Sequence, residues 1–374
     1  MSGETLVDRI AAFVRRPREE DFTGLAIEAF RWQYDNVEPY RRLCERRGMD
    51  PAAVTDWRAI PTVPTLAFKS LELAAAPARE TFRSSGTTGE RRSTHHHPYP
   101  ELYRTVIDAT FPAALLPGLD RPPMLSLIPS RHQAPDSSLS FLADHVMGRY
   151  ADEKSVTAIG DRGIQAKVVR SWLAARQREG RPVVVLATAL ALAGMLDALE
   201  RLDLRFRLPA ASRLFETGGF KGRRVETTRP ELLARAADRL GLPAGQIVRE
   251  YGMTELTSHF YTAVLAEGDP DLFVAPPWVR VRVLDPLTLE EAAPGTSGLL
   301  AVLDLANVGS AVHLLTEDLG MRQPGGFRLT GRAAGAELRG CSLTAEELAG
   351  SPREGGRGIG EPSGEPEGEG GDAA

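Results

Sequence analysis

Hydrophobic positions near the start of the chain follow a helical spacing. In residues 24–48 apolar side chains recur every three to four positions, and the stretch closes on Gly48. Residues 61–68, "PTVPTLAF", contain two prolines and are therefore expected to run extended over the surface. The pattern predicts a helical N-terminal segment, residues 1–60, packed on the rest of the chain.

From Pro98 onward, long amphipathic stretches alternate with short apolar ones. Their spacing predicts helices over residues 99–116, 137–149, 163–179, 189–202 and 229–241. It predicts strands over residues 123–129, 182–188, 212–219 and 246–252. This alternation indicates βαβ units, so we expect an α/β fold with mixed or parallel sheets and flanking helices. Short strands with turn signals then predict a smaller β-rich part over residues 273–330.

Composition excludes several classes of partner. The chain has 374 residues and a formal net charge of -5, so it lacks the basic field that holds nucleic acid. Two cysteines exclude a disulfide framework, and we expect a cytoplasmic protein with neither a signal peptide nor a membrane span. Residues 349–374 are rich in Gly, Pro and Glu and are predicted to be disordered.

The stretch "SSGTTG" gathers small hydroxyl and glycine residues. Its members are Ser84, Ser85, Gly86, Thr87, Thr88 and Gly89. A tight turn of such residues presents backbone N–H groups and hydroxyls to one point, which favours an anion such as phosphate. A flexible surface loop is the alternative. The three histidines at 95–97 cannot all converge on one metal ion, because neighbours on an extended segment face opposite ways, so a polar strand is expected.

The stretch "YGMTE" follows a predicted strand. Tyr251, Gly252, Thr254 and Glu255 are therefore expected at the carboxyl end of that strand, where open α/β sheets bind ligands. A threonine hydroxyl there suits a phosphate oxygen, and a carboxylate suits Mg²⁺. The alternative is a Thr/Glu pair that caps a helix.

Two later stretches carry further candidates. Asp318 in "TEDLG" is expected in a turn after a strand, as a ribose ligand or as a plain acidic turn. Arg332 lies in "TGR", and Cys341 lies close to Arg339, whose charge would favour the thiolate. Cys341 is a candidate nucleophile, with a buried structural cysteine as the alternative, whereas Cys44 is expected to be inert.

Taken in order, "SSGTTG", "YGMTE", "TEDLG" and "TGR" resemble the motifs of the adenylate-forming enzymes, the superfamily of acyl-CoA synthetases and firefly luciferase. The wording "SSGTTG" and "YGMTEL" is similar to the LuxE-type acyl-protein synthetases. The "ETGGFKG" stretch resembles the segment that lines the adenine pocket, which implies that Gly218 and Gly219 contact the base. The resemblance implies one adenylate-forming domain over residues 61–348.

The resemblance also implies a function. ATP, with Mg²⁺, would activate a carboxylic acid, expected to be a fatty acid, as an acyl-adenylate, and the acyl group would pass to a protein cysteine as a thioester. The "SSGTTG" loop would hold the β- and γ-phosphates, Thr254 the α-phosphate and Glu255 the Mg²⁺. Asp318 would bind the ribose, and Arg332 the ribose or a phosphate. Cys341 would carry the acyl group, and an acyl reductase or a carrier protein would be the partner.

Three departures keep other functions open. The lysine that usually follows the phosphate loop is absent, with Arg91 or Arg92 as substitutes, and Ala334 stands where Asp or Lys is usual. The mobile C-terminal domain with its catalytic lysine is expected to be missing, as in other acyl-protein synthetases. The alternatives are an acyl- or aryl-CoA or carrier-protein ligase, and a degenerate nucleotide-binding protein without turnover.

Overall fold

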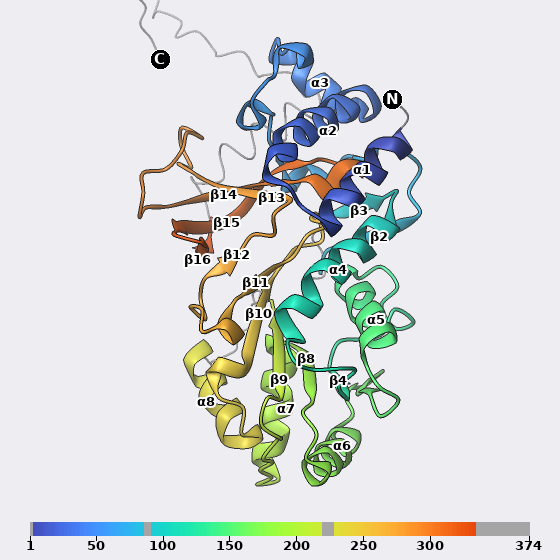
Figure 1. The fold of residues 1–374 in the computed structure, drawn as a ribbon, viewed down its shortest axis with the longest axis vertical. Coiled ribbons are helices and arrows are strands. Elements are labelled where there is room, and N and C mark those ends of the chain that lie inside the picture. The colour runs from blue at the N-terminus through green and yellow to red at the C-terminus, as the bar shows by residue number, and fades with distance from the viewer. Residues whose placement is uncertain (1–2, 86–90, 219–227, 334–374) are drawn as a thin grey trace, which may run out of the picture.

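The structure, a computed structural model, describes residues 3–85, 91–218 and 228–333, which form an α/β fold built on one long sheet (Figure 1). The helices are α1 (Gly3–Arg15), α2 (Phe22–Asn36), α3 (Glu38–Arg46), α4 (Pro100–Leu115), α5 (Ser138–Tyr150), α6 (Ala166–Glu179), α7 (Ala189–Arg201) and α8 (Arg229–Leu240). The strands are β1 (Val63–Pro64), β2 (Glu80–Arg83), β3 (Thr94–His97), β4 (Met124–Ser126), β5 (Val156–Thr157), β6 (Ile159–Gly160), β7 (Gly163–Ile164), β8 (Val184–Thr188), β9 (Arg213–Thr217), β10 (Ile247–Tyr251), β11 (Phe260–Thr262), β12 (Phe273–Val274), β13 (Val279–Leu284), β14 (Ser297–Asp304), β15 (His313–Gln323) and β16 (Gly326–Arg332).

Helix ends follow the local sequence signals. Ser137 caps α5 and Thr188 caps α7, each by accepting a backbone N–H with its hydroxyl. Thr228 forms a full capping box with Glu231 at the start of α8. Gly241 ends α8 at φ +70°, a left-handed conformation that favours glycine. The predicted helices and strands between residues 98 and 252 agree with the structure to within a few residues.

The long sheet changes character along its width. Its order is β13-β14-β15-β16-β12-β11-β10-β9-β8-β4-β5, and β1 pairs with β15. Strands β5, β4, β8, β9 and β10 run parallel, whereas β11 to β16 pair antiparallel. The predicted mixed sheet with a smaller β-rich part is therefore confirmed, with the hydrogen-bonded ladder continuous from one part to the other.

Alternate residues of the parallel strands face two separate cores. On β8, Val184 and Leu186 pack with residues of α4 and α5. Val185 and Ala187 on the same strand pack with residues of α6, α7 and α8. Because both faces of the strand are covered by helices, its run of apolar residues is buried on both sides.

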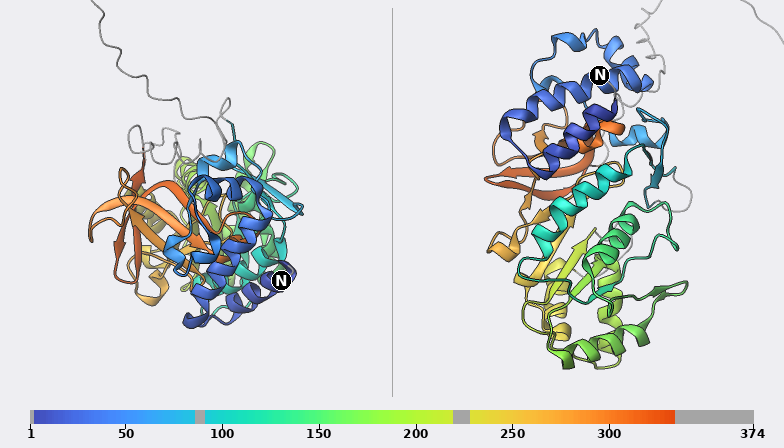
Figure 2. Two further views of the ribbon diagram at one scale, coloured as in Figure 1. Left: turned by 90° about the horizontal axis from the view of Figure 1, so that it is seen from above. Right: turned by 45° about the vertical axis from the view of Figure 1, so that its right-hand side comes forward.

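The N-terminal helices pack on the β-rich part, above the α/β body in the view of Figure 1. A single hydrophobic core joins residues of α1, α2 and α3 to residues of β13, β14 and β15. Inside it, Gln33 is fully buried, donates to the carbonyls of Asn307 and Val308, and accepts from the N–H of Val312. Helix α4 runs between these helices and the α/β body (Figure 2). No helix within the described residues has the length and apolar character needed to cross a bilayer.

The proline-rich segment 61–68 does not run extended over the surface, so that prediction is wrong. Val63 and Pro64 form β1, which pairs in parallel with Leu314 and Leu315 of β15. The chain then turns into a short 3-10 helix, η4 (Thr65–Lys69), whose Phe68 is 1% exposed. Val63, Ala67 and Phe68 are buried, and the burial of these side chains outweighs the bias of proline toward an exposed extended chain.

Candidate functional site

The carboxyl ends of two adjacent parallel strands place predicted site residues at one edge of the sheet. Strand β9 ends at Thr217 and β10 ends at Tyr251, and Glu250 pairs in register with Thr217. Gly218 follows β9 with φ +73°, in the left-handed region that favours glycine. Gly219 lies outside the described residues.

Tyr251 and Asp318 meet, although 67 positions separate them in the chain. The Tyr251 hydroxyl donates to Asp318 Oδ2 at 2.9 Å. Burial, followed by the charge of Asp318 and to a smaller extent that of Glu255, raises the pKa of Tyr251 well above its usual value. The Tyr251 hydroxyl therefore stays protonated, which leaves the Asp318 carboxylate as the acceptor.

Asp318 lies within strand β15 and not in a turn after a strand, which corrects the prediction for this residue. The long ladder with β14 and β16 holds the "TEDLG" residues extended. Asp318 pairs across the ladder with Arg332, whose guanidinium donates to Glu317 Oε2 at 2.7 Å. The Arg332 side chain is 60% exposed, so this ion pair is weak and the guanidinium is open to solvent.

Gly252 is required by the close approach of a buried, hydrogen-bonded Glu250–His259 pair. A Cβ on this residue would overlap Glu250 Oε1 and lie 3.0 Å from His259 Nδ1. His259 Nδ1–H donates to Glu250 Oε1 at 2.6 Å, and the Thr217 hydroxyl bonds to the other carboxylate oxygen. His259 Nε2 lies 3.0 Å from the Tyr103 hydroxyl. The sequence interpretation missed this group, for which Glu250, one of two charged residues in the strand run "QIVREYG", was the available signal.

Thr254 and Glu255 form a turn that leads to another strand. After Glu255 the chain continues without a helix through the described residues to β11, so the helix-capping alternative is wrong. Glu255 is 8% exposed, and Thr254 is half-buried. Glu255 lies close enough to Tyr251 and Arg332 for its charge to act on both. The turn thus brings a buried carboxylate next to the Tyr251–Asp318 pair.

Asp304 and Asn307 hold this turn from the β-rich part. The Asp304 carboxylate accepts the N–H groups of Thr257 and Ser258 at 3.3 and 2.8 Å. Asn307 Nδ2 donates to Glu255 O at 2.8 Å. Both residues are buried, and burial raises the pKa of Asp304 to about 6. The sequence analysis did not identify Asp304 and Asn307, because their position inside an apolar run was the only signal that pointed to them.

The β2–β3 hairpin closes the base of the predicted phosphate loop. Ser84 Oγ accepts the Ser93 N–H at 3.0 Å, and the Ser84 N–H donates to Ser93 O at 3.0 Å. The Arg92 guanidinium donates to Ser84 O and pairs with Asp136 at 3.2 Å. Arg92 is therefore already engaged by the hairpin backbone and by Asp136. Ser85 is exposed. The next residues, Gly86, Thr87, Thr88 and Gly89, lie outside the described residues.

The histidine triplet lies on β3 and connects the hairpin to the turn after β10. His95 and His97 face one side of the strand and are buried, whereas His96 faces the other side. His95 Nδ1–H donates to Thr254 O at 2.9 Å. The predicted polar strand is confirmed, and two of its three histidines, His95 and His97, are buried. Among the described residues, no group of three His, Cys, Asp or Glu side chains is placed to hold a metal ion.

Buried histidines make the folded state sensitive to acid. Burial lowers the pKa of His95 and of His313 to about 4, and lowers that of His97 well below 6.5. Between about pH 6.5 and pH 4 the unfolded chain binds more protons at these sites, so the free energy of unfolding falls as the pH falls. Each histidine contributes about 1.4 kcal/mol per pH unit. Asp304 has the opposite effect, because its raised pKa lets the folded state bind more protons than the unfolded chain as the pH falls below about 6. Its contribution to the free energy of unfolding offsets that of one histidine.

Denaturant unfolding at pH 7, 6 and 5 measures this dependence. In His313→Asn the amide nitrogen can still donate to Ile60 O, as Nδ1 does in the wild type. The slope of the free energy of unfolding against pH should fall by the contribution of about one proton. His132→Gln changes an exposed histidine and should leave the slope as in the wild type. Equal slopes for all three proteins would contradict the assignment.

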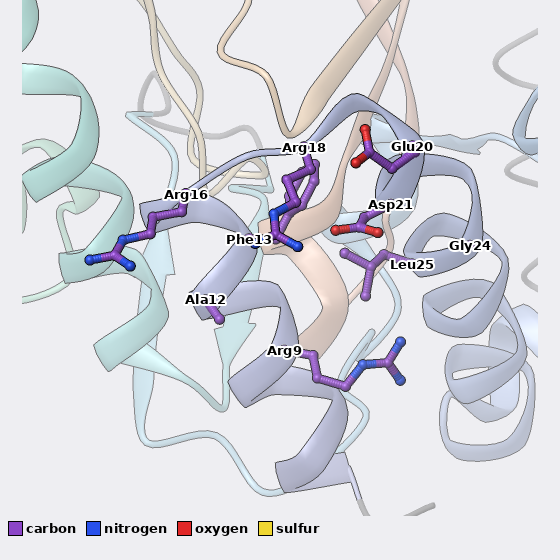
Figure 3. Close-up of a pocket in the computed structure, with 9 residues that line it drawn as sticks. All are labelled: Arg9, Ala12, Phe13, Arg16, Arg18, Glu20, Asp21, Gly24 and Leu25. Atoms are coloured by element: carbon purple, nitrogen blue, oxygen red, sulfur yellow. The ribbon is translucent and has the colours of Figure 1, made fainter.

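A cavity of about 510 Å³ lies between α1 and α2 (Figure 3). Its lining consists of Arg9, Ala12, Phe13, Arg16, Arg18, Glu20, Asp21, Gly24 and Leu25. These residues mix both signs of charge and include none of the predicted site residues. The chemistry-bearing side chains converge at the turn after β10, so we place the candidate site there.

The structure describes one of the two cysteines, Cys44. Cys44 is fully buried on α3, and burial raises the pKa of its thiol to about 12, which agrees with the expectation that it is inert. Cys341 lies outside the described residues.

Comparisons with known proteins agree with one another. The family model "Acyl-protein synthetase, LuxE" matches residues 12–349. A long-chain-fatty-acid–luciferin-component ligase of Vibrio harveyi is 23% identical over 342 residues, which cover 88% of each chain. Its namesake from Aliivibrio fischeri is 22% identical over 324 residues, which cover 83% of each chain.

One solved structure is similar over most of the chain. It is the open conformation of 2-hydroxyisobutyryl-CoA ligase in complex with 2-HIB-AMP and CoA, at a TM-score of 0.61 and 15% identity. The match covers 86% of this chain and 77% of that one. The likeness confirms the predicted fold, that of the N-terminal part of adenylate-forming ligases.

Proposed function

Because the chain belongs to the LuxE acyl-protein synthetase family, we propose that it activates a carboxylic acid with ATP and transfers the acyl group to a protein cysteine. The activated species is an acyl-adenylate, and the product is a thioester. A long-chain fatty acid is the proposed substrate, because both relatives are named as ligases of long-chain fatty acids.

One observation carries this proposal: segments far apart in the sequence meet at one place. The Tyr251 hydroxyl bonds to Asp318, and the Thr254 carbonyl accepts from His95 of the hairpin that flanks the "SSGTTG" loop. A single ATP molecule needs its ribose and phosphate ligands within its own length. The convergence of these segments meets that requirement.

ATP has to convert a poor electrophile into a good one. A carboxylate cannot expel oxide, so its oxygen attacks the α-phosphate, pyrophosphate leaves, and the acyl group becomes bonded to AMP. In the proposed site Asp318 accepts hydrogen bonds from the ribose hydroxyls, while the Tyr251 hydroxyl fixes the orientation of its carboxylate. Thr254 contacts the α-phosphate, and the exposed guanidinium of Arg332 offsets negative charge on the nucleotide.

Glu255 suits a magnesium ion that arrives with the nucleotide. Mg²⁺ is usually held by one or two carboxylates together with substrate phosphates, and Glu255 is a buried carboxylate in the turn that carries Thr254. When bound, the ion would neutralise charge on the phosphates during transfer. Hydrogen bonds from Asn307 and His95 to the backbone of this turn hold Glu255 in place before the ligand arrives.

The second half of the reaction needs a thiolate. Cys341 is the proposed acceptor, and its thiolate would attack the acyl carbon of the adenylate, form the thioester and release AMP. An acyl reductase or a carrier protein is the proposed partner that receives the acyl group next.

Acid-dependent exchange of pyrophosphate into ATP tests the activation step. Exchange should rise with chain length across a series of fatty acids and should be absent without acid. Asp318→Asn should raise the KM for ATP about tenfold, because the ribose loses a charged acceptor. Asp35→Asn, which changes an exposed carboxylate of α2, is the matched control. Wild-type protein that binds ATP without any exchange across the acids would overturn the proposed function.

A further inference from the structure

Two buried histidines connect the hairpin to the catalytic turn, and the proposed chemistry does not use them. We propose that His95 and His97 are positioning residues that lock the β2–β3 hairpin onto the turn of residues 252–258. This lock orients Thr254 and Glu255 toward MgATP. The inference deepens the proposed function and rests on it, because it assigns the lock a role in that reaction.

His95 fixes the backbone of Thr254. Its Nδ1–H donates to Thr254 O at 2.9 Å, and since a carbonyl oxygen only accepts, the proton of His95 lies on Nδ1. The ring is 1% exposed and packs edge-on against Phe68, with 5.5 Å between ring centroids. The surrounding packing therefore holds the donor in one direction.

His97 holds Thr257 in the same turn. Asn307 Nδ2 is engaged by carbonyl oxygens, so Asn307 Oδ1 is the acceptor for the Thr257 hydroxyl at 2.6 Å. With its single proton used, the Thr257 oxygen accepts from His97 Nε2–H at 3.1 Å. His97 thus carries its proton on Nε2, whereas His95 carries it on Nδ1.

A third histidine supports the turn from the other side. His97 stacks on Tyr103 at 5.9 Å, and Tyr103 stacks on His259 at 5.6 Å between ring centroids. His259 in turn bonds to Glu250, beneath Gly252 at the start of the turn. The turn is therefore held at Thr254 and Thr257 by β3, which is distant in sequence. At its start it is held by the neighbouring Glu250–His259 pair, whose His259 ring contacts Tyr103 of α4.

This arrangement explains why the turn can be rigid without regular secondary structure. Correctly aimed charge and hydrogen-bond donors accelerate a reaction only if they do not have to reorganise when it occurs. Hydrogen bonds from β3 hold the Thr254 backbone and the Thr257 side chain, on either side of Glu255. They also join the two segments that are proposed to contact the phosphates, so movement of one displaces the other.

The opposite tautomers allow a crossed mutational test. Asparagine places its amide nitrogen where Nδ1 of histidine lies, whereas glutamine places it where Nε2 lies. His95→Asn and His97→Gln should therefore keep the donor, while His95→Gln and His97→Asn should lose it. In the pyrophosphate exchange assay, kcat/KM for MgATP should fall about tenfold in the two variants that lose the donor. It should stay within about twofold of wild type in the two that keep it.

His96 supplies the matched control, because it lies between the two positions and faces the other side of β3. His96→Asn and His96→Gln should both behave as wild type. Hydrogen–deuterium exchange of the amides of residues 252–259 adds a measurement that needs no nucleotide. These amides should exchange faster in His95→Gln and His97→Asn than in the two variants that keep the donor.

The two measurements separate the possible failures. Equal amide exchange within each pair would overturn the lock itself. Faster amide exchange with unchanged kinetics would leave only a structural role and overturn the positioning role. Wild-type protein that shows no MgATP binding by calorimetry would overturn the proposed function and the positioning role with it, while amide exchange would still decide whether the lock exists.

Discussion

Replacing Glu255 with glutamine is expected to lower acid-dependent pyrophosphate exchange about a hundredfold or more. Glutamine keeps the size of the side chain and one oxygen acceptor but removes the negative charge that would bind Mg²⁺. The turn should stay in place, because Asp304, Asn307 and His95 hold its backbone and not its carboxylate. The loss should therefore lie in catalysis and not in folding.

A Mg²⁺ titration distinguishes this role from a general effect on the site. The variant should need a higher Mg²⁺ concentration for half-maximal exchange, with a thermal midpoint close to that of the wild type. Glu290→Gln, which changes an exposed carboxylate in the turn after β13, serves as the control and should leave both quantities unchanged. Normal exchange by Glu255→Gln at limiting Mg²⁺ would contradict the assignment.

Replacing Cys341 with serine is expected to abolish covalent labelling of the protein by a radioactive acyl group while pyrophosphate exchange continues. The activation step needs ATP, acid and the residues of the turn, whereas the thioester needs the thiolate. Label on the wild-type protein should be released by neutral hydroxylamine, as expected for a thioester.

Cys44→Ala is the matched control for this experiment. Cys44 is fully buried, and its raised pKa keeps the thiol protonated, so its removal should leave the labelling intact. Undiminished labelling of Cys341→Ser would remove this cysteine from the mechanism.

Local sequence was sufficient for most elements of the α/β body. Helices α7 and α8 begin directly after the capping residues Thr188 and Thr228, and α8 ends before Gly241, so these boundaries have a cause within a few residues. The segment 61–68 defeated this reasoning, because β1 exists only through pairing with β15, some 250 positions further along the chain. The conformational preference of proline acts on neighbouring residues, whereas the strand that pairs with β1 lies far away in the sequence.

Some residues of the candidate site could be identified from the sequence, and others only from the structure. Tyr251, Thr254 and Glu255 could be named from their place after a strand, and Asp318 from its motif. The histidines of β3 were rejected as a metal site because adjacent side chains on a strand face opposite ways. This is correct for His96, which faces away from the side of His95 and His97. That argument could not reveal that His95 and His97 share a buried face against the turn.

The sequence by itself determined the kind of protein: the alternation of helices and strands, the order of the motifs and the residue types suited to ATP. Each of these depends on spacing along the chain, which the backbone periodicities of helices and strands translate directly into local structure. Only the tertiary structure decided which segments touch, such as Tyr251 with Asp318 and His95 with Thr254. Hydrogen bonds between distant residues depend on how whole elements pack, and no local pattern encodes that packing.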